Sequence, residues 1–255
     1  MNWMNFKDCI DSYPFILMEG ALGERLKREF DLDISGTVAM ADLIYQQKGR
    51  MALKTLWNEY MDIAHRYQLP FLAITPTRRA NKERVYMAGY NESIITDNVD
   101  FLRTIKETVN VNMYIGGLMG CKGDAYTSER ALNQEEAIAF HSWQASLFKS
   151  VGVDFLYAGI MPVLSEAIGM AVAMSDTDIP YIISFTIQRN GKLIDGHTIN
   201  DAIYYINNHV SNKPVCYMTN CVHPDIVYEA LSHKFNQTQM VKNRFWGIQA
   251  NTSRL

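Results

Sequence analysis

Short apolar runs alternate with longer segments of helical period along most of the chain, which is the pattern of successive β-strand and α-helix units. The runs are almost continuously hydrophobic, and several begin with proline, as expected for buried parallel strands. We predict seven strands, at residues 15–19, 70–75, 111–116, 153–158, 180–187, 214–219 and 245–250. Parallel strands require crossover connections, so the segments between them are expected to be helices.

Start signals support two of these helices directly. Asn133 followed by Glu136 resembles a capping box and predicts a helix over 134–150. Thr198 is a similar cap and predicts a helix over 199–209. Further helix boundaries are indicated by Gly152, Pro162 and Pro224.

No linker, low-complexity tract or break in composition divides the chain. We therefore predict one domain over residues 1–255, an α/β fold of the TIM (β/α)8 barrel type with strands one to seven present. The seventh strand comes only at the C-terminal end of the 255 residues, so the barrel is expected to be truncated or incomplete at its eighth unit. A complete version of this plan should continue beyond Leu255.

Charge and cysteine content narrow the class of protein. The chain has 24 Lys and Arg against 27 Asp and Glu, a net charge of −3, which argues against a nucleic acid as the main ligand. Four cysteines are too few for a disulfide framework. Neither a membrane-spanning run nor a signal peptide is recognisable, so we predict a cytoplasmic protein without membrane attachment.

Polar and small residues follow the apolar runs, and in a βα barrel the chemistry lies at the carboxyl ends of the strands. Polar and small residues gathered at this end of the strands fit a binding site for an acidic or zwitterionic small molecule better than a groove for a polymer. The positions are Glu19 with Gly20, Thr75, Thr77, Gly116 through Asp124, Ala158 with Gly159, Thr186, Asn220 with Cys221, and Asn251.

Several segments, in order, resemble the homocysteine S-methyltransferase family. ILMEGALGERLKR is similar to its opening segment, and GDAYTSERALNQEEAIAFHSWQ to its central Gly-Asp-x-Tyr loop and Phe-His helix. TNCVHPDIV resembles the Asn-Cys motif after strand six, and GIQANTS the segment at strand seven. The resemblance runs from about residue 15 to residue 255.

The resemblance implies a TIM barrel that transfers a methyl group to the thiol of homocysteine or a similar thiol, as in methionine biosynthesis. It implies zinc held by the Asn-Cys cysteine, here Cys221, together with a later Cys-Cys pair. It also implies substrate binding by Glu19, Gly20, Thr75 and Asn220. A free thiol is only about 3% thiolate at pH 7, so coordination to a metal could increase the nucleophile up to roughly thirtyfold. No residue is assigned as a catalytic acid or base.

The sequence also departs from the family pattern. The Gly-Gly-Cys-Cys segment would fall on strand eight, so Cys221 stands alone and zinc binding is expected only if further sequence supplies the pair. Ala158-Gly159 stands where the family carries Glu-Thr, and Glu19 replaces the usual Asp. The methyl donor is not readable: S-methylmethionine, a betaine or a corrinoid-bound methyl are all compatible, and so are a corrinoid protein partner and a homo-oligomer.

Each candidate residue also has a simpler interpretation. Cys221 could be a buried small side chain, and Glu19 a turn contact. His223 suggests a Cys-x-His metal pair with Cys221, but the position before Pro224 favours the start of a helix. His141 is interpreted as a core histidine that orients the loop above it. Cys216 is expected on the opposite face of its strand from Cys221, in the core.

Two other functions stay open at this stage. The chain could be a catalytically impaired barrel that binds a ligand or a partner protein, because a missing strand leaves two sheet edges to be covered. It could also be a TIM-barrel enzyme for carboxylate substrates with Glu19 and Asp124 as acid and base.

Overall fold

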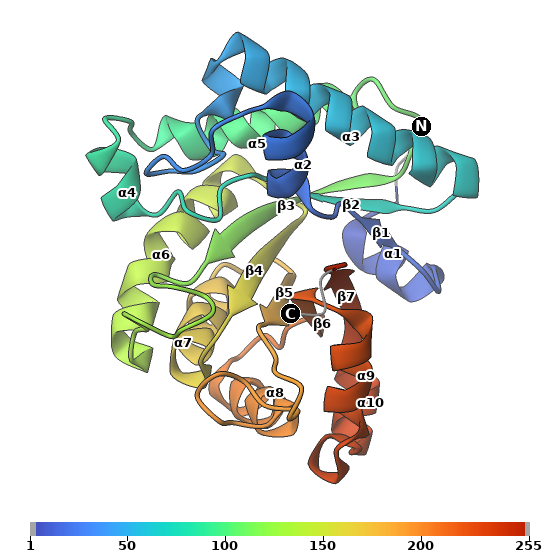
Figure 1. Cartoon of the computed structure of the whole chain (residues 1–255), viewed down its shortest axis with the longest axis vertical. Coiled ribbons are helices and arrows are strands. Elements are labelled where there is room, and N and C mark those ends of the chain that lie inside the picture. The colour runs from blue at the N-terminus through green and yellow to red at the C-terminus, as the bar shows by residue number, and fades with distance from the viewer. Residues whose placement is uncertain (1–3, 253–255) are drawn as a thin grey trace. The chain divides into compact units, whose positions relative to one another are not determined.

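The computed structural model describes residues 4–252, so Ser253 of the GIQANTS segment lies outside the described residues. All seven predicted strands are present (Figure 1). They are β1 (Leu17–Met18), β2 (Phe71–Ile74), β3 (Met113–Gly120), β4 (Phe155–Met161), β5 (Tyr181–Phe185), β6 (Cys216–Val222) and β7 (Phe245–Ala250).

One helix precedes β1, and the others occupy the connections between the strands. They are α1 (Phe6–Ser12), α2 (Leu22–Phe30), α3 (Gln47–Tyr67), α4 (Lys82–Met87), α5 (Ser93–Lys106), α6 (Gln134–Val151), α7 (Leu164–Ser175), α8 (Ile199–His209), α9 (Pro224–Ser232) and α10 (Gln239–Arg244), with the short 3-10 helices η1 (Leu43–Tyr45) and η2 (Lys234–Asn236). None of the described helices combines the length and apolar composition that a bilayer crossing requires.

The strands neighbour one another in chain order, from β1 to β7. β1, β2 and β3 pair in parallel, and so do β4, β5, β6 and β7. Parallel strands in sequential order, joined by helices, have the topology of a TIM-type α/β barrel, and seven strands of that barrel lie within the described residues. The predicted fold class is confirmed.

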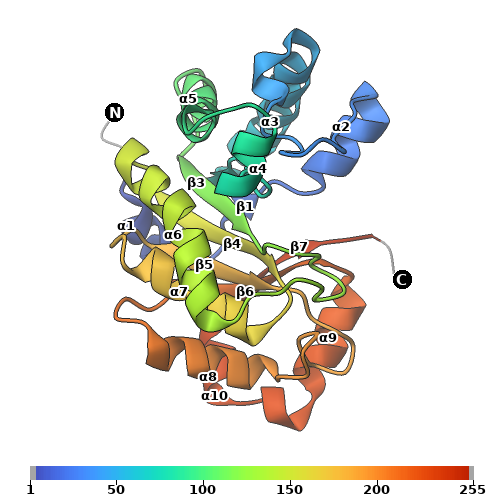
Figure 2. The same ribbon diagram turned by 90° about the vertical axis from the view of Figure 1, so that its left-hand side faces the viewer.

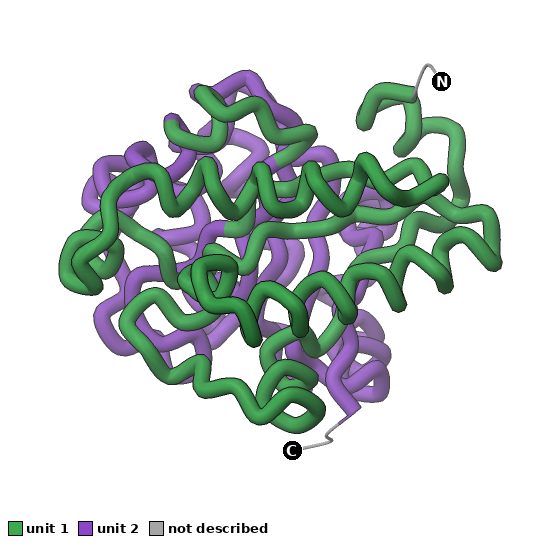
Figure 3. Tube along the Cα trace, turned by 90° about the horizontal axis from the view of Figure 1, so that it is seen from above, with its two compact units in different colours: residues 1–118, 147–155 green, residues 119–146, 156–255 purple. Residues whose placement is uncertain are grey.

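The chain divides into two compact units, shown in different colours in Figure 3. Unit 1 contains residues up to Leu118 together with Leu147–Phe155. Unit 2 contains Met119–Ser146 and the residues from Leu156 onward. A single domain over residues 1–255 stays a prediction.

In unit 1 the N-terminal helix supplies an aromatic contact to the strands. Asn5 caps α1 by accepting a hydrogen bond from the Asp8 N–H at 2.9 Å. The buried Phe6 then stacks on Phe155 with 4.8 Å between ring centroids. Because every residue of β2 is also buried, the core of unit 1 lies against both faces of this strand.

In unit 2 the predicted helix starts are confirmed. Asn133 and Glu136 exchange side-chain to backbone hydrogen bonds before α6, and Thr198 and Asp201 form a capping box before α8. The helix α8 packs against both α7 and α10 (Figure 2). His223 caps α9 through its Nδ1, which accepts from the Asp225 N–H at 3.1 Å, so the helix-start interpretation of His223 is confirmed.

Three strands extend further at their carboxyl ends than predicted, while β1 and β5 are shorter than the predicted runs 15–19 and 180–187. β3 runs to Gly120 instead of residue 116, β4 to Met161 instead of 158, and β6 to Val222 instead of 219. In each case the apolar run ends at small or polar residues that still belong to the strand. Residues Ala158, Gly159, Asn220 and Cys221 therefore lie within strands and not after them.

Candidate functional site

Glu19 directly follows β1 in unit 1 and is only 3% exposed. Its Oε1 accepts a hydrogen bond from the Ile74 N–H of β2 at 2.9 Å. Burial raises the pKa of the Glu19 carboxyl to about 8, against the lowering effect of the Ile74 hydrogen bond. Both the turn contact and the substrate-binding role of Glu19 stay predictions.

Gly20 lies beside Glu19 and is fixed by α3. The Tyr60 hydroxyl of α3 donates a hydrogen bond to the Gly20 carbonyl oxygen. A Cβ at Gly20 would meet no atom within 4 Å, so the backbone here has open space next to it. This is compatible with close approach of a ligand to the backbone.

Thr75 and Thr77 link β2 to β3 through their hydroxyls. Thr77 Oγ1 donates to the Leu118 carbonyl at 2.8 Å, and Leu118 N–H donates to Thr75 Oγ1 at 3.0 Å. Since the Thr77 proton is used on Leu118, Thr75 must donate in the 2.7 Å contact between the two hydroxyls. Thr75 can therefore offer a ligand only a lone pair. Its substrate-binding role stays a prediction.

In unit 2, Asn220 on β6 is held by the two strands beside it. Its Oδ1 accepts from the Ile160 N–H of β4 at 3.1 Å and from the Ser184 hydroxyl of β5 at 2.7 Å. The Ile160 N–H can only donate, so it fixes which end of the amide is oxygen. Within residues 4–252 the Asn220 Nδ2 makes no hydrogen bond, and this 7% exposed side chain keeps two N–H donors for an outside acceptor.

The backbone is irregular near the carboxyl ends of β4 and β6, the two strands joined by the Asn220–Ile160 hydrogen bond. Ile160 and Cys221 have φ values of 58°, and the register shifts at both positions. A positive φ at a β-branched residue such as Ile160 is uncommon and costs of order 1–3 kcal/mol. Bulges of this kind redirect side chains at the rims of barrels. Here the bulge in β6 coincides with the residue proposed as a metal ligand.

Cys221 is exposed, while Cys9, Cys121 and Cys216 are buried. The alternative that Cys221 is a buried small side chain is therefore wrong. Cys216 lies in the core as predicted, and burial raises the pKa of its thiol to about 12. Among residues 4–252, no three or more His, Cys, Asp or Glu side chains are grouped so as to hold a metal ion.

The difference in burial leads to a labelling prediction. Under native conditions we expect one thiol, that of Cys221, to react with iodoacetamide at least about ten times faster than the other three. Peptide mapping by mass spectrometry after timed quenching measures each site. Cys221→Ser should remove the fast phase, while Cys216→Ser should not; a fast phase that survives Cys221→Ser would contradict the exposed position of this sulfur.

The other predicted positions differ in their surroundings. Asp124 Oδ1 accepts from the N–H groups of Tyr126 and Thr127 in a tight turn. The Thr186 hydroxyl is buried and has no hydrogen-bond partner within the described residues. Ala158 and Gly159 are buried in β4. Asn251 donates its N–H to the Val222 carbonyl at 2.9 Å.

Sequence reasoning missed two residues of unit 2. Ser184, a partner of Asn220, stands in the apolar run 180–187. Glu166 is fully buried in α7, where its carboxylate accepts from His141 at 3.1 Å. In both cases the available signal was a polar side chain inside an apolar segment, because such groups are buried only with hydrogen-bond partners.

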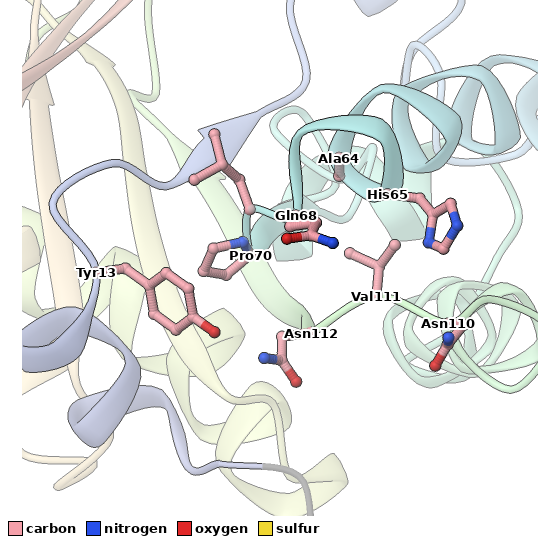
Figure 4. A pocket seen from close by; sticks show the side chains of 9 residues that line it. Tyr13, Ala64, His65, Gln68, Pro70, Asn110, Val111 and Asn112 are labelled. Atoms are coloured by element: carbon pink, nitrogen blue, oxygen red, sulfur yellow. The ribbon is translucent and has the colours of Figure 1, made fainter.

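A pocket of about 240 Å³ in unit 1 lies at the opposite ends of the strands (Figure 4). It is formed where α3 ends and where β2 and β3 begin, and it includes Tyr13, His65, Gln68, Asn110 and Asn112. None of the predicted site residues lines it. The carboxyl ends of the strands therefore stay the candidate site.

Comparison with known proteins identifies relatives of this fold. The metallated form of the homocysteine methyltransferase MmuM from Escherichia coli aligns with a TM-score of 0.76 and 17% identity over 97% of this chain and 96% of that chain. The oxidized form gives 0.76 and the apo form 0.68, both at 17% identity over 97% of this chain and 95% of the other. Among curated proteins none matches.

A sequence likeness this low establishes a common fold alone. The family assignment comes from a separate match. The model of the family described as homocysteine S-methyltransferase covers residues 16–254, which include Glu19, Asn220 and Cys221. The chain belongs to the homocysteine S-methyltransferase family.

Proposed function

We propose that this protein transfers a methyl group from a small-molecule or protein-bound donor to the thiol of homocysteine or a similar amino-acid thiol. The observation that carries the proposal is the family match over residues 16–254, which spans the Asn220-Cys221 motif. In the reaction a sulfur–carbon bond forms, the bond between the methyl carbon and the donor breaks, and the thiol proton is lost to solvent. With homocysteine as acceptor the product is methionine, which assigns the reaction to methionine biosynthesis.

The proposal gives Asn220 the role of binding the substrate. Its oxygen is occupied by Ile160 and Ser184, so only its N–H donors remain for a ligand. Two amide N–H groups suit an acceptor such as the α-carboxylate of an amino acid. Hydrogen bonds to a charged group are worth about 1.5–3 kcal/mol.

Glu19 is proposed to contact the substrate amino group. A buried carboxyl with a pKa of about 8 is mostly protonated at neutral pH, and a nearby ammonium group would favour its ionised form. A carboxylate beside an ammonium would discriminate amino-acid thiols from thiols without an amino group. The open space at Gly20 leaves room for that group to approach the backbone.

Zinc assistance is a separate proposal with a narrower basis. Cys221 would supply one thiolate, and the remaining ligands would have to come from outside residues 4–252, because the described residues do not form a complete ligand set. A corrinoid protein partner, a homo-oligomer and a cytoplasmic location remain predictions from sequence.

Asn220→Asp tests the substrate-binding role with little change of shape. The carboxylate can still accept from Ile160 and Ser184, but its second oxygen faces the ligand as an acceptor and a negative charge. We expect about 10- to 100-fold weaker binding of homocysteine, equivalent to about 1.4–2.8 kcal/mol. Isothermal titration calorimetry measures this, with unfolding curves as the check on stability.

The methyl transfer itself is assayed with homocysteine and, in separate reactions, S-methylmethionine, glycine betaine and methylcobalamin, with zinc supplied. Formation of methionine with one donor supports the proposal, and Asn220→Asp should reduce it. Homocysteine binding without transfer from any donor would favour the alternative of a ligand-binding module. Absence of both binding and transfer would contradict the proposed function.

A further inference from the structure

The segment between β3 and α6, residues 121–132 and called here the β3–α6 loop, begins where β3 ends at Gly120. In βα barrels, loops at this end of the strands carry the functional groups. The segment has no helix or strand of its own, so its conformation depends on contacts with other elements.

A single buried carboxylate holds both ends of this loop. Glu166 of α7 is fully buried, and its Oε1 accepts from the Lys122 N–H at 2.7 Å. Its Oε2 accepts from the Leu132 N–H at 3.3 Å. The neighbouring Ser165 hydroxyl donates to the Leu132 carbonyl at 2.9 Å, so the first turn of α7 binds both backbone groups of Leu132.

His141 of α6 completes the arrangement. It is 1% exposed, and its Nε2 lies 3.1 Å from Glu166 Oε1. Burial lowers the pKa of His141, which favours the neutral ring. Since a carboxylate oxygen accepts, the contact requires the tautomer with the proton on Nε2. Glu166 is thereby oriented from α6 while it holds the loop.

The loop between these two anchors is folded on itself. Asp124 N–H donates to the Glu129 carbonyl at 3.2 Å, and a Cβ at Gly123 would lie 1.8 Å from the same oxygen. Only glycine fits at position 123 in this conformation. The two anchors therefore position a compact loop and not a loose segment.

We infer that Glu166 is a positioning residue, whose carboxylate, oriented by His141, fixes both ends of the β3–α6 loop at the carboxyl end of β3. The loop carries Asp124 and the 56% exposed Tyr126. That the fixed loop contributes to binding of the amino-acid thiol rests on the proposed function. The anchoring of the loop does not.

Glu166→Gln is the test, because it preserves size but replaces one acceptor oxygen with an NH₂ group. Whichever way the amide turns, either Lys122 or Leu132 loses its acceptor. We expect amide hydrogen exchange in peptides covering residues 121–132 to accelerate by about tenfold or more. Glu136→Gln is the matched control: Glu136 bonds to the exposed Asn133 N–H beside the loop, and exchange within 121–132 should be unchanged.

Exchange in the loop that is unchanged in Glu166→Gln would overturn the anchor. If Glu166→Gln does not fold, Ser165→Ala removes the bond to the Leu132 carbonyl alone, and faster exchange confined to the C-terminal end of the loop is then expected. In a folded Glu166→Gln protein, the Kd or KM for homocysteine should rise at least about fivefold, with kcat changed less. Faster amide exchange in the loop with unchanged thiol binding would overturn the role of the loop in substrate binding but would still support its anchoring by Glu166. The exchange measurement tests the anchoring even if no thiol binds to the protein.

Discussion

At pH 8 and above, the Glu19→Gln variant is expected to be more stable than the wild-type protein by up to about 5 kcal/mol, and at pH 4 the two should be nearly equal. The reason is the raised pKa of the buried Glu19 carboxyl, from 4.5 to about 8. Each unit of pKa shift corresponds to about 1.4 kcal/mol between folded and unfolded states. The fully buried position means that solvent screening does not reduce this effect.

The sign of this pH dependence of stability follows from the number of protons bound in the folded and unfolded states. Below pH 4.5 the carboxyl is protonated in both states, so it contributes no pH dependence. Between pH 4.5 and 8 it stays protonated in the folded protein but ionises on unfolding, so wild-type stability falls as the pH rises. Glutamine can still accept from the Ile74 N–H, and it never ionises.

Urea unfolding at a series of pH values measures the difference. Glu107→Gln, at an exposed position just after α5, is the control and should leave the dependence on pH unchanged. If the wild-type and Glu19→Gln stabilities stay parallel from pH 4 to 9, the carboxyl is not held in its neutral form. The same variant should bind homocysteine more weakly if Glu19 contacts the ammonium group.

The strands could be predicted because buried parallel strands are nearly continuous apolar runs, which leaves a local signal. The ends of β3 and β6 could not be predicted from this signal. Gly116 and Asn220 look like strand ends because glycine and asparagine are common in turns. In β3 the glycine instead accommodates an aromatic ring, and in β6 the asparagine binds the neighbouring strands. Both reasons depend on residues distant in the sequence.

The candidate site, like the strands, could be predicted only in part from the sequence. Glu19 and Asn220 were identified because they stand at the end of apolar runs in the sequence, and this needs only the order of elements. The partners that define their chemistry are far away along the chain: Ser184 is 36 residues from Asn220, and Ile74 is 55 residues from Glu19. No spacing rule connects such pairs. The pKa of Glu19 likewise depends on burial, which a sequence does not state.

Gly116→Ala is expected to destabilise the protein by about 3 kcal/mol or more, because there is no space for a methyl group at this position of β3. A Cβ at Gly116 would lie 2.3 Å from Phe155 Cζ. Phe155 is fully buried and stacked on Phe6, so its ring cannot move away without disturbing α1. Overpacking of a tight core costs typically 1–3 kcal/mol and occasionally more.

Thermal and urea unfolding of three variants separate this steric effect from the general cost of replacing glycine. Gly36→Ala is the control, since its Cβ would meet nothing within 4 Å, and its stability should change by less than about 1 kcal/mol. Combining Gly116→Ala with Phe155→Leu removes the ring atoms that clash, so the double variant should be less destabilised than the sum of the two single changes. Additive losses would mean that the ring of Phe155 does not occupy the space beside Gly116, and the close approach of β3 and β4 at this point would then be wrong.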